Sequence, residues 1–457
     1  TWGRAIMGGA VALSLLFGGT GLYVGFVGAP GMLGPEEAGA DVAAAGIAVV
    51  PFSVSGGEDL NLWREGMVDL MSTNLDGMGG FRTIDSRTVM ARWAERVSGD
   101  EDPDLRTALE VAAETGARYG LVGALVGNPA GIRLNAELYD LSSGDKVVQV
   151  SEEGAADDVL ELTSALSVDL TRELLRETGQ GTGQDLRLGA LTTTSLPALR
   201  AHLRAEAAFR NGDFAGAVAG YEQAVEQDSL FALAWFRLSS AYGWLDDISS
   251  EAGGHAGERA VALMERLPAR DRILVQASEA ARLGDPSFHG EIRDAVRLYP
   301  DDPDIWFELG EYIYHTGVEV GAASLDEAVR AFDRAIALDP EFGPYRVHPL
   351  ELTIAGGNRE EAEARFAEYR ERTQDSRYVL RAELAIPLLL GDDEEFAQAI
   401  ERSLSLDEGA LGRIRAAYIN RTDFYYRLRE LQWANRDRAG MEHQWMLYSL
   451  FAEGALT

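Results

Sequence analysis

The feature that most constrains this chain is a helical spacing that recurs through its second half. Small and large apolar residues alternate there so that one face of a helix carries them, and the small members leave room for a second helix to approach closely. Units of this kind cannot bury their apolar faces alone and must stack on one another. The recurring residues are Ala217, Tyr221 and Ala224; Trp235 and Leu238; Trp306 and Leu309; and Ala328, Phe332 and Ala335.

These spacings resemble tetratricopeptide repeats, in which two antiparallel helices interlock with the next pair. Gly212-Asp213 marks the turn of the first repeat, and an insertion near 318–324 separates the helices of the clearest one. We expect about five to seven degenerate repeats, because weaker matches also occur. The resemblance implies an α-solenoid over 196–457, closed by C-terminal capping helices. The weaker matches lie at 273–300, 345–369 and 378–404.

The same resemblance implies a protein-binding face. First-helix side chains between the packing positions line the concave side of such arrays, and aromatic rings there are rigid anchors for a partner. The alternative is that neighbouring segments bury these side chains in the core. Carried over to this chain, the concave-face residues are His202, Phe209, Phe236, Trp244, Phe307, Tyr314 and His315.

Aromatic residues are frequent beyond Asp407, where further helices are expected. Two interpretations stay open, since these helices could cap the solenoid or form an interface with a second protein. The residues concerned are Tyr418, Phe424, Tyr425, Tyr426, Trp433, Trp445, Tyr448 and Phe451.

The chain begins with an apolar run that predicts a transmembrane helix over 1–28. Ala5–Val27 carries no charge and is long enough to cross about 30 Å of hydrocarbon. Arg4 before the run and acidic residues after it predict a single-pass inner-membrane protein with a cytoplasmic N-terminus and a periplasmic bulk. A cleaved signal peptide fits less well, because the run exceeds a usual signal core. Small residues four apart would let another helix pack here: Ala10, Ser14 and Gly18, and Gly21 and Gly25.

Two glycine-rich segments separate the remaining parts. Residues 29–46 are expected to form a flexible tether, and 179–195 a linker. Between them, 47–178 alternates strand and helix signals in the order β-α-β-α-α-β-β-β-α. It begins with the buried strand Ile47–Phe52 and contains a turn at Ser142–Asp145. The fold class is therefore mainly α with a small α/β domain, a mixed sheet covered by helices.

Four segments of the α/β domain resemble one family: IAVVPF at 47–52, WREGM at 63–67, GARYGLVGAL at 116–125 and ELYDLSSGDKV at 137–147. They are similar to the TolB-like N-terminal domain. In bacterial Ser/Thr kinases and adenylate cyclases that domain commonly lies outside the membrane and precedes tetratricopeptide repeats. The resemblance implies a TolB-like mixed α/β sandwich. Since no catalytic residue is known to accompany that domain, it also implies binding or packing.

The net charge and the motifs that the sequence lacks exclude several classes of function. The formal net charge is −33 and there is no cysteine; a strongly acidic surface repels phosphates, so no nucleic-acid partner is expected. A cationic partner protein is one interpretation of this acidity, and simple solubility is the other. No phosphate loop, HExxH motif or nucleophile elbow occurs. We therefore predict no enzymatic activity, no catalytic residue, no cofactor and no metal.

Adjacent acidic residues recur at the expected repeat turns. They are interpreted as solvated loop and cap residues. The three pairs are Asp246-Asp247, Asp301-Asp302 and Asp392-Asp393.

The leading hypothesis is a non-catalytic, membrane-anchored scaffold that binds other proteins as an accessory subunit of a large inner-membrane complex. Similarity to extrinsic scaffold subunits favours a bacterial photosynthetic reaction-centre and light-harvesting assembly. The alternative is the extracytoplasmic sensor half of a bacterial Ser/Thr kinase-type protein. The expected partners are membrane-complex proteins and, through the N-terminal helix, the lipid bilayer. A kinase domain encoded before Thr1 would favour the sensor.

Overall fold

The computed structural model describes residues 46–57, 60–97, 104–128, 131–178, 193–245, 251–283, 285–314, 325–373 and 376–404. Several predictions concern residues outside these ranges: the transmembrane helix with Ala10, Ser14, Gly18, Gly21 and Gly25, nearly all of the tether and linker, His315, and the aromatic segment beyond Asp407. They stay predictions. Within the described ranges, no helix combines the length and the apolar character that crossing a bilayer requires.

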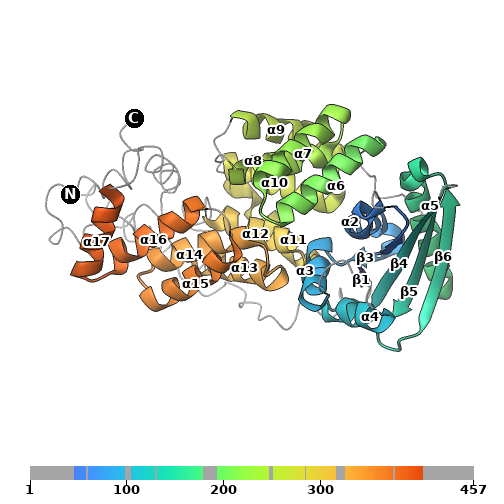
Figure 1. Cartoon of the computed structure of the whole chain (residues 1–457), viewed down its shortest axis with the longest axis horizontal. Coiled ribbons are helices and arrows are strands. Elements are labelled where there is room, and N and C mark those ends of the chain that lie inside the picture. The colour runs from blue at the N-terminus through green and yellow to red at the C-terminus, as the bar shows by residue number, and fades with distance from the viewer. Residues whose placement is uncertain are drawn as a thin grey trace, which may run out of the picture. The chain divides into compact units, whose positions relative to one another are not determined.

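A mixed sheet forms the centre of the α/β domain (Figure 1). Strands β3, β1 and β4 run parallel, and β4, β5 and β6 form an antiparallel meander. The predicted small α/β domain is therefore present. In spatial order the strands are β3 (Arg82–Thr83), β1 (Gly46–Val49), β4 (Tyr119–Asn128), β5 (Gly131–Asp140) and β6 (Lys146–Gly154).

The first predicted strand, Ile47–Phe52, is wrong in its extent. β1 ends at Val49, and a separate strand β2 (Ser53–Ser55) pairs further along the same neighbour, with Ser53 opposite Ala124 of β4. Pro51 lies between the two strands. A proline has no N–H to donate to the ladder, so it interrupts the strand at this point.

Four helices cover the sheet: α2 (Leu62–Leu75), α3 (Ser86–Arg96), α4 (Leu105–Glu114) and α5 (Val159–Glu177). The alternation of side chains along β1 and the residue that follows it assigns two helices to each face of the sheet. Ile47 and Val49 belong to the apolar cluster that contains α2 and α5, whereas Ala48 and Val50 belong to the cluster of α3 and α4. Successive residues of a strand point to opposite faces, so each face receives one helix pair.

From 193 to 404 the described chain is helical, and successive helices pair (Figure 1). Six pairs are described, which confirms the predicted helical-repeat array. The pairs are α6 (Leu196–Arg210) with α7 (Phe214–Gln227), α8 (Ala232–Leu245) with α9 (Glu251–Ala262), α10 (Ala269–Leu283) with α11 (His289–Leu298), α12 (Pro303–Tyr312) with α13 (Leu325–Leu338), α14 (Val347–Ala355) with α15 (Arg359–Arg372), and α16 (Ser376–Leu390) with α17 (Asp393–Leu404).

Small residues stand where helices of a pair cross. A Cβ added to Gly310 would lie 2.5 Å from the Phe332 ring, and one added to Gly220 would lie 2.8 Å from Cβ of Ala205. Larger side chains at these places would force the helices apart. At the first of these pairs, the crossing involves Phe332, one of the recurring residues of the sequence.

The α/β domain and the repeats share one continuous apolar core, which runs from β1 through α2 and α6 to Tyr345. At the α2–α6 contact, a Cβ on Gly66 would lie 2.7 Å from Cδ1 of Leu203. Beside it, Arg210 Nη2 lies 2.6 Å from Glu65 Oε2. The two parts therefore pack directly against each other.

Candidate functional site

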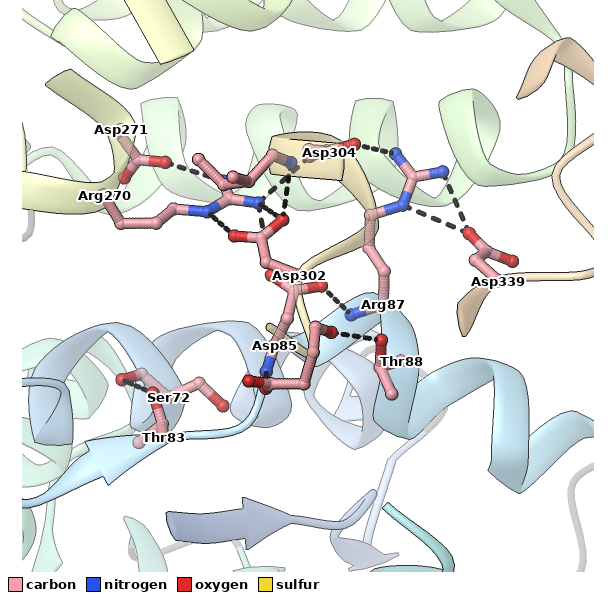
Figure 2. A network of polar contacts seen from close by, with 12 residues as sticks. Ser72, Thr83, Asp85, Arg87, Thr88, Arg270, Asp271, Asp302, Asp304 and Asp339 are labelled. Atoms are coloured by element: carbon pink, nitrogen blue, oxygen red, sulfur yellow. Dashed lines mark hydrogen bonds and ion pairs between the residues drawn. The ribbon is translucent and has the colours of Figure 1, made fainter. Parts of the chain in front are cut away.

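A buried cluster of charges lies where α3 meets the repeats (Figure 2). We call it the arginine–aspartate cluster. Asp301 and Asp302 are only 7% and 2% exposed because α3 covers them, so their interpretation as solvated residues is wrong, whereas the expected cap role holds for Asp302. The cluster contains Arg82, Arg87, Arg237 and Arg270 together with Asp85, Asp271, Asp301, Asp302, Asp304, Asp339 and Glu206.

Helix capping positions the acidic side of this cluster. Asp302 precedes Pro303 at the start of α12, and its carboxylate accepts from the Ile305 amide at 3.1 Å. Aspartate at the N-cap and proline in the first turn are typical of a helix start. Asp304 follows within the first turn, where the helix dipole favours a negative charge. The local sequence thus concentrates carboxylates at one helix end.

A second helix N-terminus faces the first. Asp85 caps α3 by accepting from the Arg87 amide at 3.0 Å. Its own amide donates to Asp301 Oδ2 at 3.0 Å, and Thr88 Oγ1 donates to the Asp301 carbonyl at 2.7 Å. These bonds fix the position of α3 relative to the start of α12; Figure 2 shows Asp85, Arg87 and Thr88 at this contact.

Arg87 reaches from α3 into a pocket made by the repeats. Its Nη1 donates to Asp304 Oδ1 at 3.2 Å, while Nε and Nη2 donate to Asp339 Oδ2 at 3.2 and 3.1 Å. Its guanidinium carbon lies 4.2, 5.4 and 5.9 Å from the ring centroids of Phe342, Tyr345 and Phe209. Charge-assisted bonds and cation–π contacts reinforce each other here. We call Phe209, Asp304, Asp339, Phe342 and Tyr345 the Arg87 pocket.

Arg270 and Arg237 complete the charge pairing. Arg270 holds Asp302 in a bidentate pair, at 2.6 Å from Nε and 2.9 Å from Nη2, and also reaches Asp85 and Asp304 at 3.2 Å each. Arg237 Nη1 donates to Asp304 Oδ2 at 3.1 Å. Asp304 is therefore in contact with Arg87, Arg237 and Arg270, and links them.

The neighbouring charges shift the pKa values of Asp304 and Asp85 in opposite directions. For Asp304, burial opposes ionisation, but the attraction of Arg87, Arg237 and Arg270 prevails and holds its pKa well below the usual range. For Asp85, burial and the nearby Asp302 carboxylate raise the pKa well above its usual range. The pKa is therefore lowered for the carboxyl at the centre of the cluster, Asp304, and raised for the one at its edge, Asp85.

The predicted concave-face residues fall into two groups. Phe209, Trp244 and Phe307 belong to a closed circle of aromatic rings, completed by Phe214, Tyr345 and Phe342, which sequence reasoning missed. Successive centroid distances are 5.5 Å from Phe209 to Phe214, 5.9 Å to Trp244, 6.1 Å to Phe307, 4.9 Å to Tyr345, 4.7 Å to Phe342 and 5.5 Å back to Phe209.

The other predicted residues lie elsewhere. Phe236 is buried in a separate apolar cluster, and Tyr314 is buried and donates to Glu351 Oε2 at 2.8 Å. His202 packs between Tyr221 and Phe231, with centroids 5.5 and 4.9 Å away. For Phe236, Tyr314 and His202 the structure therefore agrees with burial in the core, the second of the two interpretations, while their role toward a partner stays a prediction.

His202 sits close to the cluster and is held neutral. Burial lowers its pKa to about 4, against the opposing influence of Glu206, whose Oε1 lies 3.6 Å from His202 Nε2. Tyr221 also donates to this Glu206 oxygen, at 2.7 Å. The histidine thus fills the core next to an ionised carboxylate.

No grouping of histidine and acidic side chains suited to a metal ion occurs in the part of the chain that the structure describes. Pairing instead satisfies the carboxylates around Arg87 and Arg270. The arrangement is able to hold segments together and to recognise a guanidinium group.

No family model matches the chain, and no curated protein matches it. Among solved structures it is similar to YrrB, a tetratricopeptide-repeat protein with an unusual peptide-binding site, at 20% identity over 40% of this chain and 91% of that one, with a TM-score of 0.23. It is also similar to the human IFIT1 dimer with PPP-AAAA, at 12% identity over 65% and 70% of the two chains, with a TM-score of 0.33.

The fold assignment rests on the chain's own helix pairing, with glycine and alanine at the crossings and one core from β1 to η8 (Gly343–Arg346). By that packing, the chain is a helical-repeat protein that carries a small α/β domain.

Proposed function

We propose that this protein is a non-catalytic scaffold that binds other proteins through its helical-repeat array. One observation supports this most directly: the array holds a helix N-terminus from another part of the same chain. It does so with carboxylates and aromatic rings around Arg87. Aromatic and charged groups at fixed positions are the usual energetic centre of a protein interface.

The electrostatics of the chain agree with such a role. Its net charge of −33 attracts cationic surfaces over several ångströms and speeds their association. The attraction weakens as salt screens the charges. A cationic protein is therefore the preferred class of partner.

The finer proposal is an anchored subunit. The apolar run Ala5–Val27, preceded by Arg4 and followed by acidic residues, supports a helix in the inner membrane with the repeats in the periplasm. The partner would then be a large membrane complex, with the photosynthetic reaction-centre and light-harvesting assembly as the specific proposal. Protease added to right-side-out cells should remove the repeats; cleavage only in inverted vesicles would contradict the orientation.

Native purification with cross-linking tests the scaffold proposal. The full chain is extracted in mild detergent, and co-eluting proteins are identified by mass spectrometry after cross-linking. A stoichiometric protein partner cross-linked to α6–α17 supports the proposal. Elution of the chain at its own mass alone, or cross-links confined to the β4–β6 meander, would overturn binding through the repeats.

A further inference from the structure

Contacts among residues of the repeats hold the Arg87 pocket together, and Arg87 itself is not needed for them. Tyr345 Oη donates to Asp304 Oδ1 at 2.7 Å, and the rings of Phe342 and Tyr345 lie 4.7 Å apart. Phe342 also stacks on Phe209 at 5.5 Å. Because these contacts tie the walls to each other, the pocket is organised by the array itself.

The geometry of the pocket selects a guanidinium group over an ammonium group. Three nitrogens of Arg87 donate to two separate carboxylates, those of Asp304 and Asp339. The ring of Phe342 covers the guanidinium at 4.2 Å. A lysine has one nitrogen and no planar face, so it cannot bridge both carboxylates while stacking on the ring.

Charge makes an empty pocket unfavourable. Among the described contacts, the ion pair of the Asp339 carboxylate is with Arg87 alone. Asp304 retains Arg237 and Arg270 when Arg87 leaves. A buried carboxylate without its partner is strongly disfavoured, so the vacated pocket would attract another cation of the same shape.

Helix α3 contacts the array through its polar side. Thr88 bonds to the Asp301 carbonyl at 2.7 Å, and Arg92 Nη2 bonds to the Ala337 carbonyl at 2.8 Å. Its apolar residues Val89 and Trp93 instead pack in the cluster of its own sheet. Water can replace the polar bonds, whereas the apolar face stays covered when α3 moves away from the array.

From these observations we propose that the Arg87 pocket is an arginine-recognition site, that Arg87 is its tethered ligand, and that an exposed arginine of a partner protein replaces it. The proposal deepens the scaffold function and rests on it, because it names the chemistry of the partner. The α/β domain would stay attached during this exchange through α2 and α6, where Gly66 packs against Leu203.

Chemical rescue of the full-length Arg87→Ala variant tests the pocket. The thermal midpoint is measured with millimolar methylguanidinium, and with methylammonium as the matched control. We expect methylguanidinium to raise the midpoint of Arg87→Ala by about 3 °C or more relative to its effect on the wild type. Methylammonium should not do so, and Arg87→Ala with Asp339→Asn should show no rescue. Equal responses of the single and double variants would overturn the recognition site.

A competing peptide tests whether an arginine of another molecule can replace Arg87 in the pocket. A fluorescent peptide with the sequence of residues 81–97 is titrated into the wild type and into Arg87→Ala, alongside a peptide with lysine in place of the Arg87 equivalent. The arginine peptide should bind Arg87→Ala at least about tenfold more tightly than the wild type, and more tightly than the lysine peptide. Equal binding of both peptides, or binding to neither protein, would overturn replacement by a partner.

A second variant covers the case in which Arg87→Ala does not fold, and co-purification separates failure of this inference from failure of the scaffold function. If circular dichroism shows that Arg87→Ala does not fold, Arg87→Gln replaces it in both measurements, since it keeps a polar side chain but leaves Asp339 without a cation. Failure of the scaffold function would appear as a chain that purifies without a protein partner. Failure of this inference alone would appear as a partner that binds wild type and Arg87 variants equally, with no methylguanidinium rescue.

Discussion

The α/β domain meets the repeats through two contacts of opposite chemistry. Around α2 and α6 the contact is apolar, with Gly66 against Leu203 in a continuous core. Around α3 and α12 it is built from buried charges, with Arg87 between Asp304 and Asp339. The apolar contact tolerates any group of suitable volume, whereas the charged contact requires each donor to find its acceptor. The apolar contact therefore holds the two parts together, and the charged contact fixes their relative position and makes stability depend on pH and salt.

The largest expected effect comes from breaking the charged contact at its centre. Asp304→Asn leaves Arg87, Arg237 and Arg270 without their shared carboxylate, and removal of one partner from a buried network costs about 3–5 kcal/mol. The urea midpoint of the full chain measures this loss. The exposed Asp294→Asn, which removes an ion pair on α11 with Arg297, is the control and should change stability by less than about 1 kcal/mol. Similar losses in both variants would contradict the role of Asp304.

Truncation on the apolar side should cost slightly less and respond differently to salt. Leu203 is buried against α2, and Leu203→Ala should reduce the free energy of unfolding by about 3 kcal/mol. Salt between low and physiological concentration should leave this difference unchanged, because no charge is lost. The control is Leu298→Ala, since Leu298 is 56% exposed. A strong salt dependence of the Leu203 effect would show that the two contacts are not separate.

The pH dependence of stability distinguishes the buried histidine from the acids. The pKa of His202 is lowered from 6.5 to about 4 on folding, so its contribution is fully present above pH 6.5 and is lost as the pH falls toward 4. The loss amounts to roughly 2.5 kcal/mol by pH 4.5. Asp85 and Asp302, whose pKa values burial raises, act in the opposite direction, because their contribution is lost as the pH rises.

The difference between the pH profiles of two proteins isolates the contribution of His202 to stability. Subtracting the pH profile of His202→Gln from that of the wild type removes the contributions that the two proteins share, including those of Asp85 and Asp302. The difference should grow as the pH falls below 6.5. A flat difference between pH 7 and 4.5 would contradict a neutral, buried His202.

The smallest effect is expected at the rim of the apolar contact. Glu65, whose side chain is 46% exposed, pairs with Arg210 at 2.6 Å. Glu65→Gln should lower stability by about 0.5 kcal/mol, and the difference should disappear at high salt, since exposed ion pairs are weak and screened. Equilibrium unfolding at two salt concentrations measures it. A loss as large as that of Asp304→Asn would show that the charged contact extends to this rim.

Much of the fold follows from rules that act over a few residues. The strands of the meander, the paired helices and their caps, such as Asp213 before α7 and Asp302 before α12, follow from periodicity, turn residues and capping. The main error of this kind, at Pro51, also has a local cause, because the residue was assigned to a strand that it interrupts. Such features depend on neighbours in sequence.

The candidate site depends on contacts that no local pattern contains. Arg87 and Asp339 are 252 positions apart, and nothing in the spacing around either residue indicates the other. Likewise Phe209 and Phe307 are aromatic side chains off the packing positions, but the rings that pack on them, Phe342 and Tyr345, come from the segment that follows α13.

The sequence by itself determined the elements, the repeat spacing and an acidic chain without a recognisable catalytic motif. Only the tertiary structure decided that Asp301 and Asp302 are buried, that the predicted binding aromatics close on each other, and that Arg87 occupies the array. The physical reason is that helix formation and pairing are governed by interactions within a few turns. Burial of a charge, in contrast, is favourable only when distant segments bring its counter-charge to the same place.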